Sequence, residues 1–592
     1  MEMLHSCLIP ELSKLKESSK EAVENTESFD QFKQYLHIKR KVEDELKQLI
    51  ELAIASPTNY LILVCGSVGD GKSHLLSYLK SQNPKINNFC YIHNDATESS
   101  APDKTSMDTL FEVLKDFSDL ELEQKEPEKS ILLAINLGTL NNFLNTEYAH
   151  HFTYLKKYVS EKKILEAKIV ENGFEKESKF QFVNLSDYHL FSLTEDGPVS
   201  PFVESALNKI VDQKEDNPFY QNYKRNCLEG CPATAQCPVK YNYDLLMQEQ
   251  VKKSIVQFIA ELTLKYKTII SSRTLFNFFY HILVDTELEQ KGSTDTVDQY
   301  VTSLNNKQIL LALMPNLLFN FSDSSEVFKN LVQLDPINKR SETLDTLTIT
   351  FYNTKNLLHL FEYYIDKKVI LDTILQNTIN DLQGRDRHIS LQTLLRFYAL
   401  IPNNDNKSLN IQDDIYNSYV KDLYYWNKGI KSNLMGLYQD TVIKGIYEWN
   451  GKSEPGRINI YPGRNQLKYT ISQPIKIRSY TQDLKETTEE QLDKFLPYMI
   501  LQFVNPDEAE SKKYEIRVDY PLYELLVRIK EGYRPNLKDK NNFINFVDFI
   551  SNIIKNNKEQ ESLKITEKVG KELKEYELVY HDDFGKFEFK EI

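Results

Sequence analysis

A glycine-rich stretch near the amino end has the residue types and spacing that bind phosphate groups. Residues 66–73, GSVGDGKS, fit the pattern G-x-x-x-x-G-K-[ST] without a mismatch. Glycines let such a loop wrap tightly, so that its backbone N–H groups point at the phosphates. We therefore expect ATP binding, with Lys72 at the β- and γ-phosphates and the Ser73 hydroxyl on Mg²⁺. The residues expected to bind the nucleotide are Gly66, Ser67, Gly69, Asp70, Gly71, Lys72 and Ser73.

Hydrolysis of ATP also needs a carboxylate beside the magnesium and a group that polarises water. The apolar run ending in Asp-Glu that usually supplies this carboxylate is absent. Two assignments of the strands, which we call the first and the second register, are therefore open. In the first, the third strand ends at Asn136, in the usual place of the acid, and the fourth ends at Asn184, a polar sensor of the γ-phosphate. In the second, Asn136 is the sensor and the acids are Asp95 and Glu98, which can equally cap a turn. The short spacing between the loop and Asp95 favours the first register.

An arginine farther along the chain is a further catalytic candidate. The segment 269–285, IISSRTLFNFFYHILVD, predicts a helix that begins near Arg273. Its aromatic residues are expected to form a buried face that packs in the core. An arginine at the start of such a helix can reach the γ-phosphate, as the second sensor of AAA+ proteins does. The alternative is a surface arginine.

Three of the six cysteines lie within eleven positions: Cys227, Cys231 and Cys237. Two of them precede proline, which stiffens the loop. The spacing C-x₃-C-x₅-C is not that of common zinc modules, and the sequence shows no fourth ligand nearby. A metal site, with zinc ahead of an iron–sulfur cluster, and an ordinary loop with reduced thiols are both open.

A basic stretch stands out in a chain of net charge −14. Between Arg457 and Arg478 there are five basic residues and no acid, with Tyr461 and Tyr469 interleaved. One interpretation is a surface that binds DNA or an acidic partner. The other is the solvent-exposed face of a hairpin. The basic residues are Arg457, Arg464, Lys468, Lys476 and Arg478.

The elements that would position these residues follow from the hydrophobic pattern. Apolar runs at 60–65, 89–95, 131–137 and 180–186 predict buried strands, and the helical stretches between them predict a parallel sheet with crossovers. We expect an α/β P-loop NTPase core, AAA+-like, then a mostly α-helical lid and an α+β C-terminal region. The expected divisions are an N-terminal helical segment (1–55), the core (56–203), a cysteine-containing insertion (204–243), a helical lid and domain (244–440) and a C-terminal domain (441–592).

Length and composition narrow the class of protein. A chain of 592 residues is too long for one core. With 41% hydrophobic and 27% charged residues it is typical of a globular protein, and no apolar run is long enough to span a membrane. The absence of a secretory signal and the few cysteines predict a cytoplasmic location. The acidic balance argues against a stand-alone DNA translocase.

The motifs taken together resemble one protein family. VCGSVGDGKSHLLSYL, HNDATES, AINLGTLNNF, VNLSDYHLFSL and the block NPFY…CPATAQCPVKYNYDLL are similar to the DptF (DndF) family. These are P-loop proteins of bacterial DNA phosphorothioation-dependent restriction systems. The resemblance runs collinearly to about residue 285, and the cysteine block makes it more specific than the phosphate loop alone.

The resemblance implies an antiphage defence role on DNA that lacks the phosphorothioate mark, together with DptG and DptH proteins. DptH usually bears the helicase-like activity, so the chain would be an ATP-driven regulator or assembly component that meets DNA directly or through partners. We expect an ATPase, and the alternative is a scaffold that binds ATP without hydrolysing it. Whether the chain forms a homo-oligomer is open, since an AAA+-like arginine finger would require a neighbouring copy.

Overall fold

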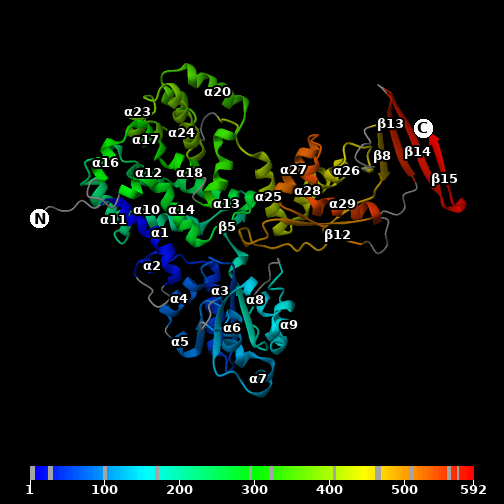
Figure 1. The fold of residues 1–592 in the computed structure, drawn as a ribbon, viewed down its shortest axis with the longest axis horizontal. Helices are drawn as coiled ribbons and strands as arrows, with labels where there is room; N and C mark the ends of the chain where they lie inside the picture. The colour runs from blue at the N-terminus through cyan, green and yellow to red at the C-terminus, as the bar shows by residue number, and fades with distance from the viewer. Residues whose placement is uncertain are drawn as a thin grey trace. The chain divides into compact units, whose positions relative to one another are not determined.

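The computed structural model divides the chain into two compact units (Figure 1). The first comprises Met1–Ser192 with Pro198–Gln412, and the second Leu193–Gly197 with Asp413–Ile592. The residues that the structure describes are 7–24, 31–83, 85–97, 103–166, 173–291, 297–320, 325–403, 408–460, 468–506, 512–556, 562–569 and 572–592.

The first unit contains a four-stranded, all-parallel sheet with the strand order β2-β3-β1-β4. Its central strand β1 pairs with β3 on one side, where Gly66 lies opposite Asn136, and with β4 on the other, where Cys65 lies opposite Asn184. The carboxyl ends of the strands therefore meet at one edge. The strands are β1 (Leu61–Gly66), β2 (Cys90–His93), β3 (Ser130–Asn136) and β4 (Phe180–Asn184).

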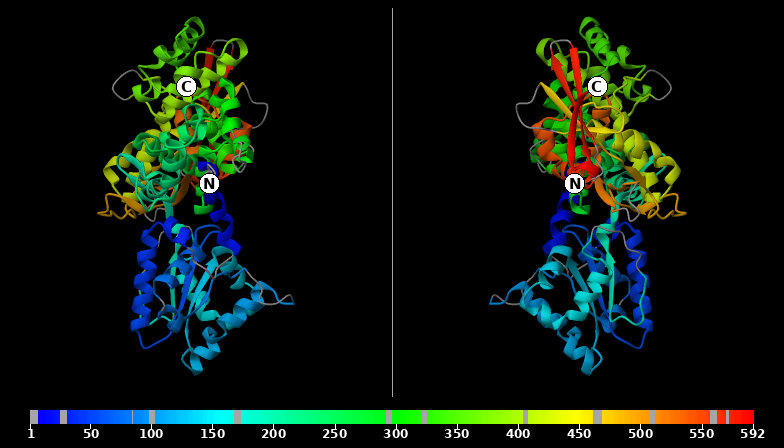
Figure 2. Two further views of the ribbon diagram at one scale, coloured as in Figure 1. Left: turned by 90° about the vertical axis from the view of Figure 1, so that its left-hand side faces the viewer. Right: turned by 90° about the vertical axis from the view of Figure 1, so that its right-hand side faces the viewer.

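Both faces of this sheet are covered by helices, as Figure 2 shows. Strand residues alternate between the faces. Leu61 and Leu63 pack in one core with α6, α8 and α9, while Ile62 and Val64 pack in another with α3 and α4. Two apolar faces explain why β1 reads as an uninterrupted apolar run. The helices of this part are α3 (Lys41–Ala55), α4 (Lys72–Gln82), α5 (Lys85–Phe89), α6 (Ser106–Leu114), α7 (Asp119–Gln124), α8 (Leu137–Phe143) and α9 (Thr153–Glu161).

The rest of the first unit is helical and has a single large core, to which helix α1 near the amino end contributes. Helix α1 packs along α14, and its first residue, Leu8, shares this core with Leu409 near the other end of the unit's sequence. The helices are α1 (Leu8–Glu24), α2 (Gln31–Leu36), α10 (Pro201–Val211), α11 (Pro218–Asn222), α12 (Pro238–Leu246), α13 (Glu249–Tyr266), α14 (Ser272–Leu283), α15 (Thr286–Lys291), α16 (Val297–Ser303), α17 (Asn306–Leu311), α18 (Met314–Asn320), α19 (Glu326–Leu331), α20 (Glu342–Asn353), α21 (Leu357–Phe361), α22 (Lys367–Ile370), α23 (Thr373–Thr378) and α24 (Arg387–Leu400).

The second unit mixes helices with antiparallel sheets. A three-stranded sheet has the order β12-β11-β9, a five-stranded sheet has the order β15-β14-β13-β8-β7, and the small sheet β10-β5-β6 includes Leu193 and Thr194. The strands β5 (Tyr188–Thr194) and β6 (Gly197–Val199) each have residues in both units. The other elements of the second unit are α25 (Asp414–Lys428), α26 (Lys444–Glu448), α27 (Tyr520–Lys530), α28 (Leu537–Asn542), α29 (Ile544–Asn556), β7 (Arg457–Ile460), β8 (Tyr469–Pro474), β9 (Arg478–Tyr480), β10 (Leu492–Lys494), β11 (Met499–Val504), β12 (Tyr514–Val518), β13 (Ser562–Val569), β14 (Glu572–His581) and β15 (Lys586–Glu591).

The coarse expectations for the fold are confirmed: a parallel α/β sheet comes first, a helical region follows, and the carboxyl-terminal region mixes helices with strands. The helical stretch expected between the third and fourth strands contains two helices, since α8 ends at Phe143 and α9 begins at Thr153. Within the described part of the chain, no helix is both long and apolar enough to cross a membrane.

Candidate functional site

The loop of residues 66–73, which we call the 66–73 loop, joins the end of β1 to the start of α4. Gly69 and Gly71 have φ angles of 87° and 86°, in the left-handed region that favours glycine. Gly71 is the N-cap of α4 and offers no side chain to the first turn. A helix start without a side-chain cap presents N–H groups to an anion, so the loop can bind a phosphate.

The Lys72 ammonium lies inside this loop, and the residue is only 9% exposed. Its Nζ donates to the carbonyl oxygens of Gly66 (3.2 Å) and Ser67 (2.6 Å) and to Asn136 Oδ1 (2.8 Å). Burial lowers the pKa of Lys72, while the carboxylates of Asp70 and Asp95 raise it. A largely desolvated cation held by weak neutral acceptors has much to gain from an anionic ligand.

A second set of contacts fixes the start of the loop. Asp70 Oδ2 accepts the Ser67 N–H at 2.6 Å and the Ser186 hydroxyl at 2.9 Å, and Ser186 Oγ also accepts from the Ser67 N–H at 2.9 Å. On the other side, the Arg40 guanidinium donates to the Asp70 carbonyl at 2.9 Å. Asp70 therefore shapes the loop through its carboxylate and its carbonyl oxygen.

The end of β2 meets the first turn of α4. The Ser73 hydroxyl donates to the Asn94 carbonyl at 3.2 Å, and the buried Oδ1 atom of Asn94 has no hydrogen-bond partner among the described residues. The next residue, Asp95, is exposed and accepts the N–H (2.8 Å) and the hydroxyl (2.6 Å) of Thr97. The structure thus brings Ser73 and the Asp95 segment together, while Glu98 lies outside the described residues.

The two asparagines at the ends of β3 and β4 differ in their contacts. Asn136 reaches Lys72, as described above. Asn184 donates to Asp187 at 2.7 Å and accepts the Ser186 N–H at 3.2 Å, so its amide shapes the short turn η3 (Leu185–Asp187). The contact with Lys72 therefore places Asn136 in the site, whereas the contacts of Asn184 are local.

The amino end of α14 abuts the 66–73 loop. Ser271, the N-cap of α14, lies so close to Gly69 that a Cβ atom on Gly69 would come within 2.7 Å of Ser271 Cβ. Arg273 lies in the first turn of this helix and is exposed. The structure thus places the start of α14 at the loop, while the role of Arg273 at the γ-phosphate stays a prediction.

The cysteine loop lies elsewhere in the first unit. Cys227 lies in the π-helix η4 (Tyr223–Leu228), Cys231 follows it, and Cys237 is the N-cap of α12. Among the described residues, no three His, Cys, Asp or Glu side chains are arranged to hold a single metal ion. All six cysteines are free thiols.

The basic stretch of 457–478 lies on strands of the second unit. The Arg457 guanidinium donates to the carbonyl oxygens of Ser472 (2.9 Å) and Ser562 (3.2 Å), and Lys468 pairs with Glu567 at 2.6 Å. Two members of the stretch thus bind within their own sheet. Arg478 is exposed on β9, Lys476 lies between β8 and β9, and Tyr461 and Arg464 lie outside the described residues.

Several residues of the site carry no signal in the sequence. Arg40 and Ser186 contact the loop from 30 and 116 residues away from Asp70, and Ser271 reaches Gly69 only through the fold. His37 is similar: its Nδ1 lies 3.2 Å from Nε2 of His74, the residue after Ser73. Compared with known proteins, the chain matches no family model and no curated protein.

Proposed function

We propose that the first unit binds ATP–Mg²⁺ at the 66–73 loop and hydrolyses it. The observation that carries this proposal is the buried Lys72 ammonium, enclosed by a glycine loop at the amino end of α4. A lysine in a loop of this pattern binds the β- and γ-phosphates, and the uncapped first turn of α4 adds its N–H groups. Asn136, already in contact with Lys72, would then adjoin the γ-phosphate.

Ser73 would hold the magnesium through its hydroxyl, and the ion would neutralise charge on the phosphates. The nearest oxygen ligands from another element are those of Asn94 and Asp95, since Ser73 already contacts the Asn94 backbone. This contact favours the register in which Asp95 supplies the acid and Asn136 is the sensor. Asp95 would orient the attacking water or accept its proton.

In the reaction, a water oxygen forms a bond to the γ-phosphorus while the bond to the β,γ-bridging oxygen breaks. The products are ADP, phosphate and one proton. Lys72 and Arg273 would stabilise the negative charge on the phosphoryl oxygens. Since Arg273 lies in the first turn of a helix whose N-cap packs against Gly69, ATP binding would be coupled to the position of the helical region.

The resemblance to the DptF family provides the biological context of this proposal. The chain would be the ATPase component of a DNA phosphorothioation-dependent restriction complex, acting on unmodified DNA with DptG and DptH proteins. The hydrolytic cycle would regulate or assemble this complex. In this context, the basic stretch of 457–478 remains a candidate surface for DNA.

A second candidate function is a scaffold that binds ATP without turnover. The specific observation in its favour is the Asp95 side chain, one oxygen of which is already engaged by Thr97 in a local turn. If this turn persists when ATP binds, Asp95 would not supply the acid at the magnesium, and ATP would only set the conformation.

The test is phosphate release and ATP binding by the full chain and by Lys72→Ala, with and without unmodified DNA. We expect Lys72→Ala to abolish turnover and to weaken ATP binding at least about tenfold, because a charged hydrogen-bonding partner of the phosphates is lost. Lys80→Ala is the matched control, since Lys80 lies exposed at the other end of the same helix. It should behave as the unchanged chain.

The outcomes separate the candidates. Turnover in the unchanged chain, lost in Lys72→Ala and retained in Lys80→Ala, supports the ATPase. Tight binding without turnover under every condition supports the scaffold. Equal ATP affinity in all three proteins would contradict both.

A further inference from the structure

The five-stranded sheet of the second unit has an open edge at β15. In the strand order β15-β14-β13-β8-β7, β15 is the last strand, and within the described part of the chain it pairs only with β14. Figure 1 shows β15 on the far side of β14 from β13. All six residues of β15 are exposed. The outer backbone groups of such an edge strand can pair with a further strand.

The pairing with β14 determines which backbone groups of β15 point outward. The Ile592 N–H donates to the Glu575 carbonyl of β14 at 3.0 Å. In an antiparallel ladder, successive residues direct their N–H and carbonyl groups alternately to the two sides. Every second residue counted back from Ile592 therefore bonds toward β14, and the backbone groups of Phe587, Phe589 and Glu591 point to the open edge.

The side chains of β15 alternate between an apolar face and a charged face. On the apolar face, Phe587 is 70% and Phe589 is 59% exposed. Both rings extend an aromatic surface from β14. Phe587 packs on Tyr580 with ring centroids 4.8 Å apart, and Phe589 stacks on Tyr576 with ring centroids 5.3 Å apart. Exposed apolar side chains gathered on one face indicate a contact surface.

The other face of β15 carries charges of alternating sign: Lys586, Glu588 and Lys590. Glu588 lies 2.9 Å from His581 Nε2, and Lys590 pairs with Glu577 at 3.2 Å, so two of these charges also contact β14. Lysines on an edge strand usually keep other strands away. Here the glutamate between them makes the strand complementary in charge to an antiparallel copy of itself.

We propose that β15 pairs with β15 of a second copy of this chain, antiparallel and about a twofold axis at Phe589. In this register, Glu588 of each copy lies opposite Lys590 of the other, which gives two cross-strand ion pairs. The outward backbone groups of Phe587 bond to those of Glu591, and the two Phe589 residues pair across the axis. The aromatic faces of the two sheets then form one continuous surface.

Other registers that keep the two aromatic faces on one side are less favourable. With the axis at Glu588, Lys586 would lie opposite Lys590 and Glu588 opposite itself, so like charges would meet. With the axis at Phe587, Lys586 would face Glu588, but few strand residues would pair because the turn η11 (Asp582–Phe584) lies just before β15. The proposed register combines opposite charges with most of the length of the strand.

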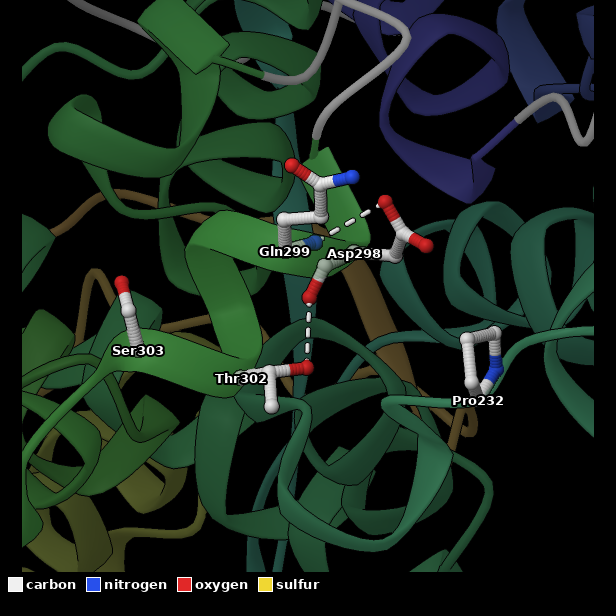
Figure 3. A pocket seen from close by; sticks show the side chains of 5 residues that line it. All are labelled: Pro232, Asp298, Gln299, Thr302 and Ser303. Atoms are coloured by element: carbon white, nitrogen blue, oxygen red, sulfur yellow. Dashed lines mark hydrogen bonds between the residues drawn. The ribbon is translucent and has the colours of Figure 1, made fainter.

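A pocket in the first unit has a different character. It is lined by Pro232 and by four residues of α16, which are Asp298, Gln299, Thr302 and Ser303 (Figure 3). The Gln299 N–H donates to Asp298 Oδ1 at 2.9 Å, and the Thr302 hydroxyl donates to the Asp298 carbonyl at 2.7 Å. Its polar groups therefore bond within their own helix, whereas the outward groups of β15 have no partner strand among the described residues.

The experiment is sedimentation equilibrium of the full chain over a range of concentrations, together with the variants Glu588→Lys and Lys590→Glu. We expect the unchanged chain to dimerise and each variant to associate at least about tenfold more weakly, because two ion pairs become two contacts between like charges. An equimolar mixture of the two variants should associate as the unchanged chain does, since opposite charges again face each other. Lys586→Glu is the matched control: in the proposed register Lys586 faces no charge, so association should not change.

A cross-link tests the position of the axis. Residues that pair through backbone hydrogen bonds have Cα atoms about 5.5 Å apart, within the span of a disulfide. With a copper–phenanthroline oxidant, Phe589→Cys should therefore give a covalent dimer that neither the unchanged chain nor Lys586→Cys gives. Circular dichroism verifies that the variants fold.

Three results would overturn the proposal. The first is a chain that stays monomeric at every concentration, which would leave the open edge to a strand of another protein. The second is a dimer that neither charge reversal weakens, and the third is a weakened dimer that mixing the two variants does not restore.

Discussion

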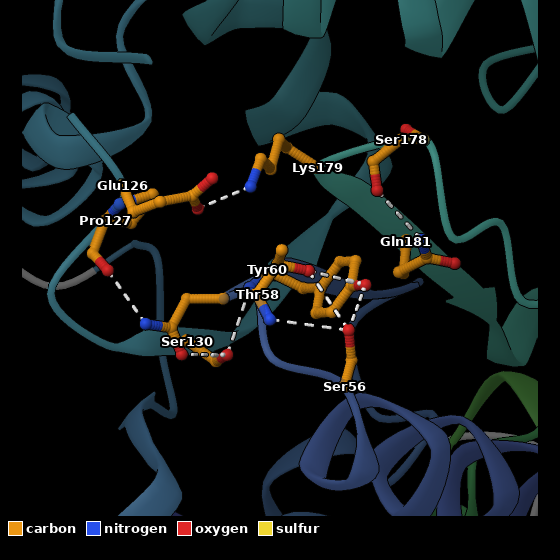
Figure 4. A network of polar contacts seen from close by, with 10 residues as sticks. Ser56, Thr58, Tyr60, Glu126, Pro127, Ser130, Ser178, Lys179 and Gln181 are labelled. Carbon is orange, nitrogen blue, oxygen red and sulfur yellow. Dashed lines mark hydrogen bonds and ion pairs between the residues drawn. The ribbon is translucent and has the colours of Figure 1, made fainter. Parts of the chain in front are cut away.

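The two edges of the parallel sheet are built from different chemistry. At the amino edge, Figure 4 shows a network of mostly neutral groups. The Tyr60 N–H donates to Ser130 Oγ at 3.0 Å, Ser130 in turn donates to Asn59 at 3.1 Å, and the Tyr60 hydroxyl bonds to Ser56 and Thr58 at 2.7 Å. Tyr60 and Ser130 are almost fully buried. The polar groups at this edge therefore satisfy one another's hydrogen bonds.

At the carboxyl edge the groups are charged or polar, and their bonds are less complete. Lys72 is buried among neutral acceptors, Asn94 Oδ1 is buried without a partner among the described residues, and Asp95 is exposed. Uncompensated polar groups at low exposure cost stability. One edge therefore stabilises the sheet, whereas the other retains groups that a ligand can satisfy, as expected where parallel strands bind ligands.

The largest expected effect is at Asp95. We expect Asp95→Asn to lower the rate of ATP hydrolysis about a hundredfold with little change in ATP affinity, because the amide cannot act as a base or carry the charge that magnesium favours. Phosphate release and ATP binding, measured on the same preparation, separate the two quantities.

Asp103→Asn is the control for this change, since Asp103 is an exposed acid that follows the same strand. It should leave both quantities unchanged. If Asp95→Asn hydrolyses ATP as fast as the unchanged chain, Asp95 is not the catalytic acid. The first register, in which Asn136 takes the usual place of the acid, would then be favoured.

A smaller effect is expected from Gly69→Ala. An alanine at φ 87° is strained, and its Cβ would meet Ser271 Cβ at 2.7 Å, so the loop or the start of α14 must shift. A cost of about 1–3 kcal/mol corresponds to about a tenfold to hundredfold loss of ATP affinity. Isothermal titration with a non-hydrolysable ATP analogue measures it.

Gly585→Ala serves as the comparison for backbone strain alone, because Gly585 has φ 57° and no atom near its Cβ position. It should not alter ATP affinity. Unchanged affinity in Gly69→Ala would mean that the loop and α14 separate without cost.

At the amino edge we expect the opposite pattern. Ser130→Ala removes the acceptor of the buried Tyr60 N–H and should lower the free energy of unfolding by about 1–3 kcal/mol while ATP affinity stays the same. Urea unfolding measures the first quantity. Ser81→Ala, which removes an exposed hydroxyl bonded to its own helix, should change neither, and a loss of ATP affinity in Ser130→Ala would erase the distinction between the edges.

Much of this sheet could be predicted from sequence, because local signals are strong where both faces are apolar. The runs ending at Gly66, Asn136 and Asn184 became parallel strands, and the glycine spacing located the loop. Contacts between distant segments could not be predicted: nothing in the sequence near Gly69 indicates Ser271, and nothing near Arg40 indicates Asp70. Such pairs depend on how helices pack, which hydrophobic periodicity does not specify.

The smallest expected effect is a pH response of the carboxyl edge. His37 lies between Glu43, at 3.0 Å, and His74 in the first turn of α4, and it stacks on Tyr78. Burial, with the charges of His74 and Lys209, lowers the pKa of His37 from 6.5 to about 4. The unfolded chain therefore binds more protons between these values, so this group should lower stability as the pH falls from about 6.5 to about 4.

Urea unfolding of the unchanged chain and of His37→Gln across this range measures the contribution. Because His37 is partly open to solvent, we expect the unchanged chain to lose about 1–2 kcal/mol more than the variant. Burial raises the pKa of Glu43, which acts in the opposite sense, but it does so in both proteins and cancels in the difference. Parallel curves of unfolding free energy against pH for the two proteins would show that protonation of His37 does not change stability. The carboxyl edge would then be as insensitive to pH in this range as the neutral network around Tyr60.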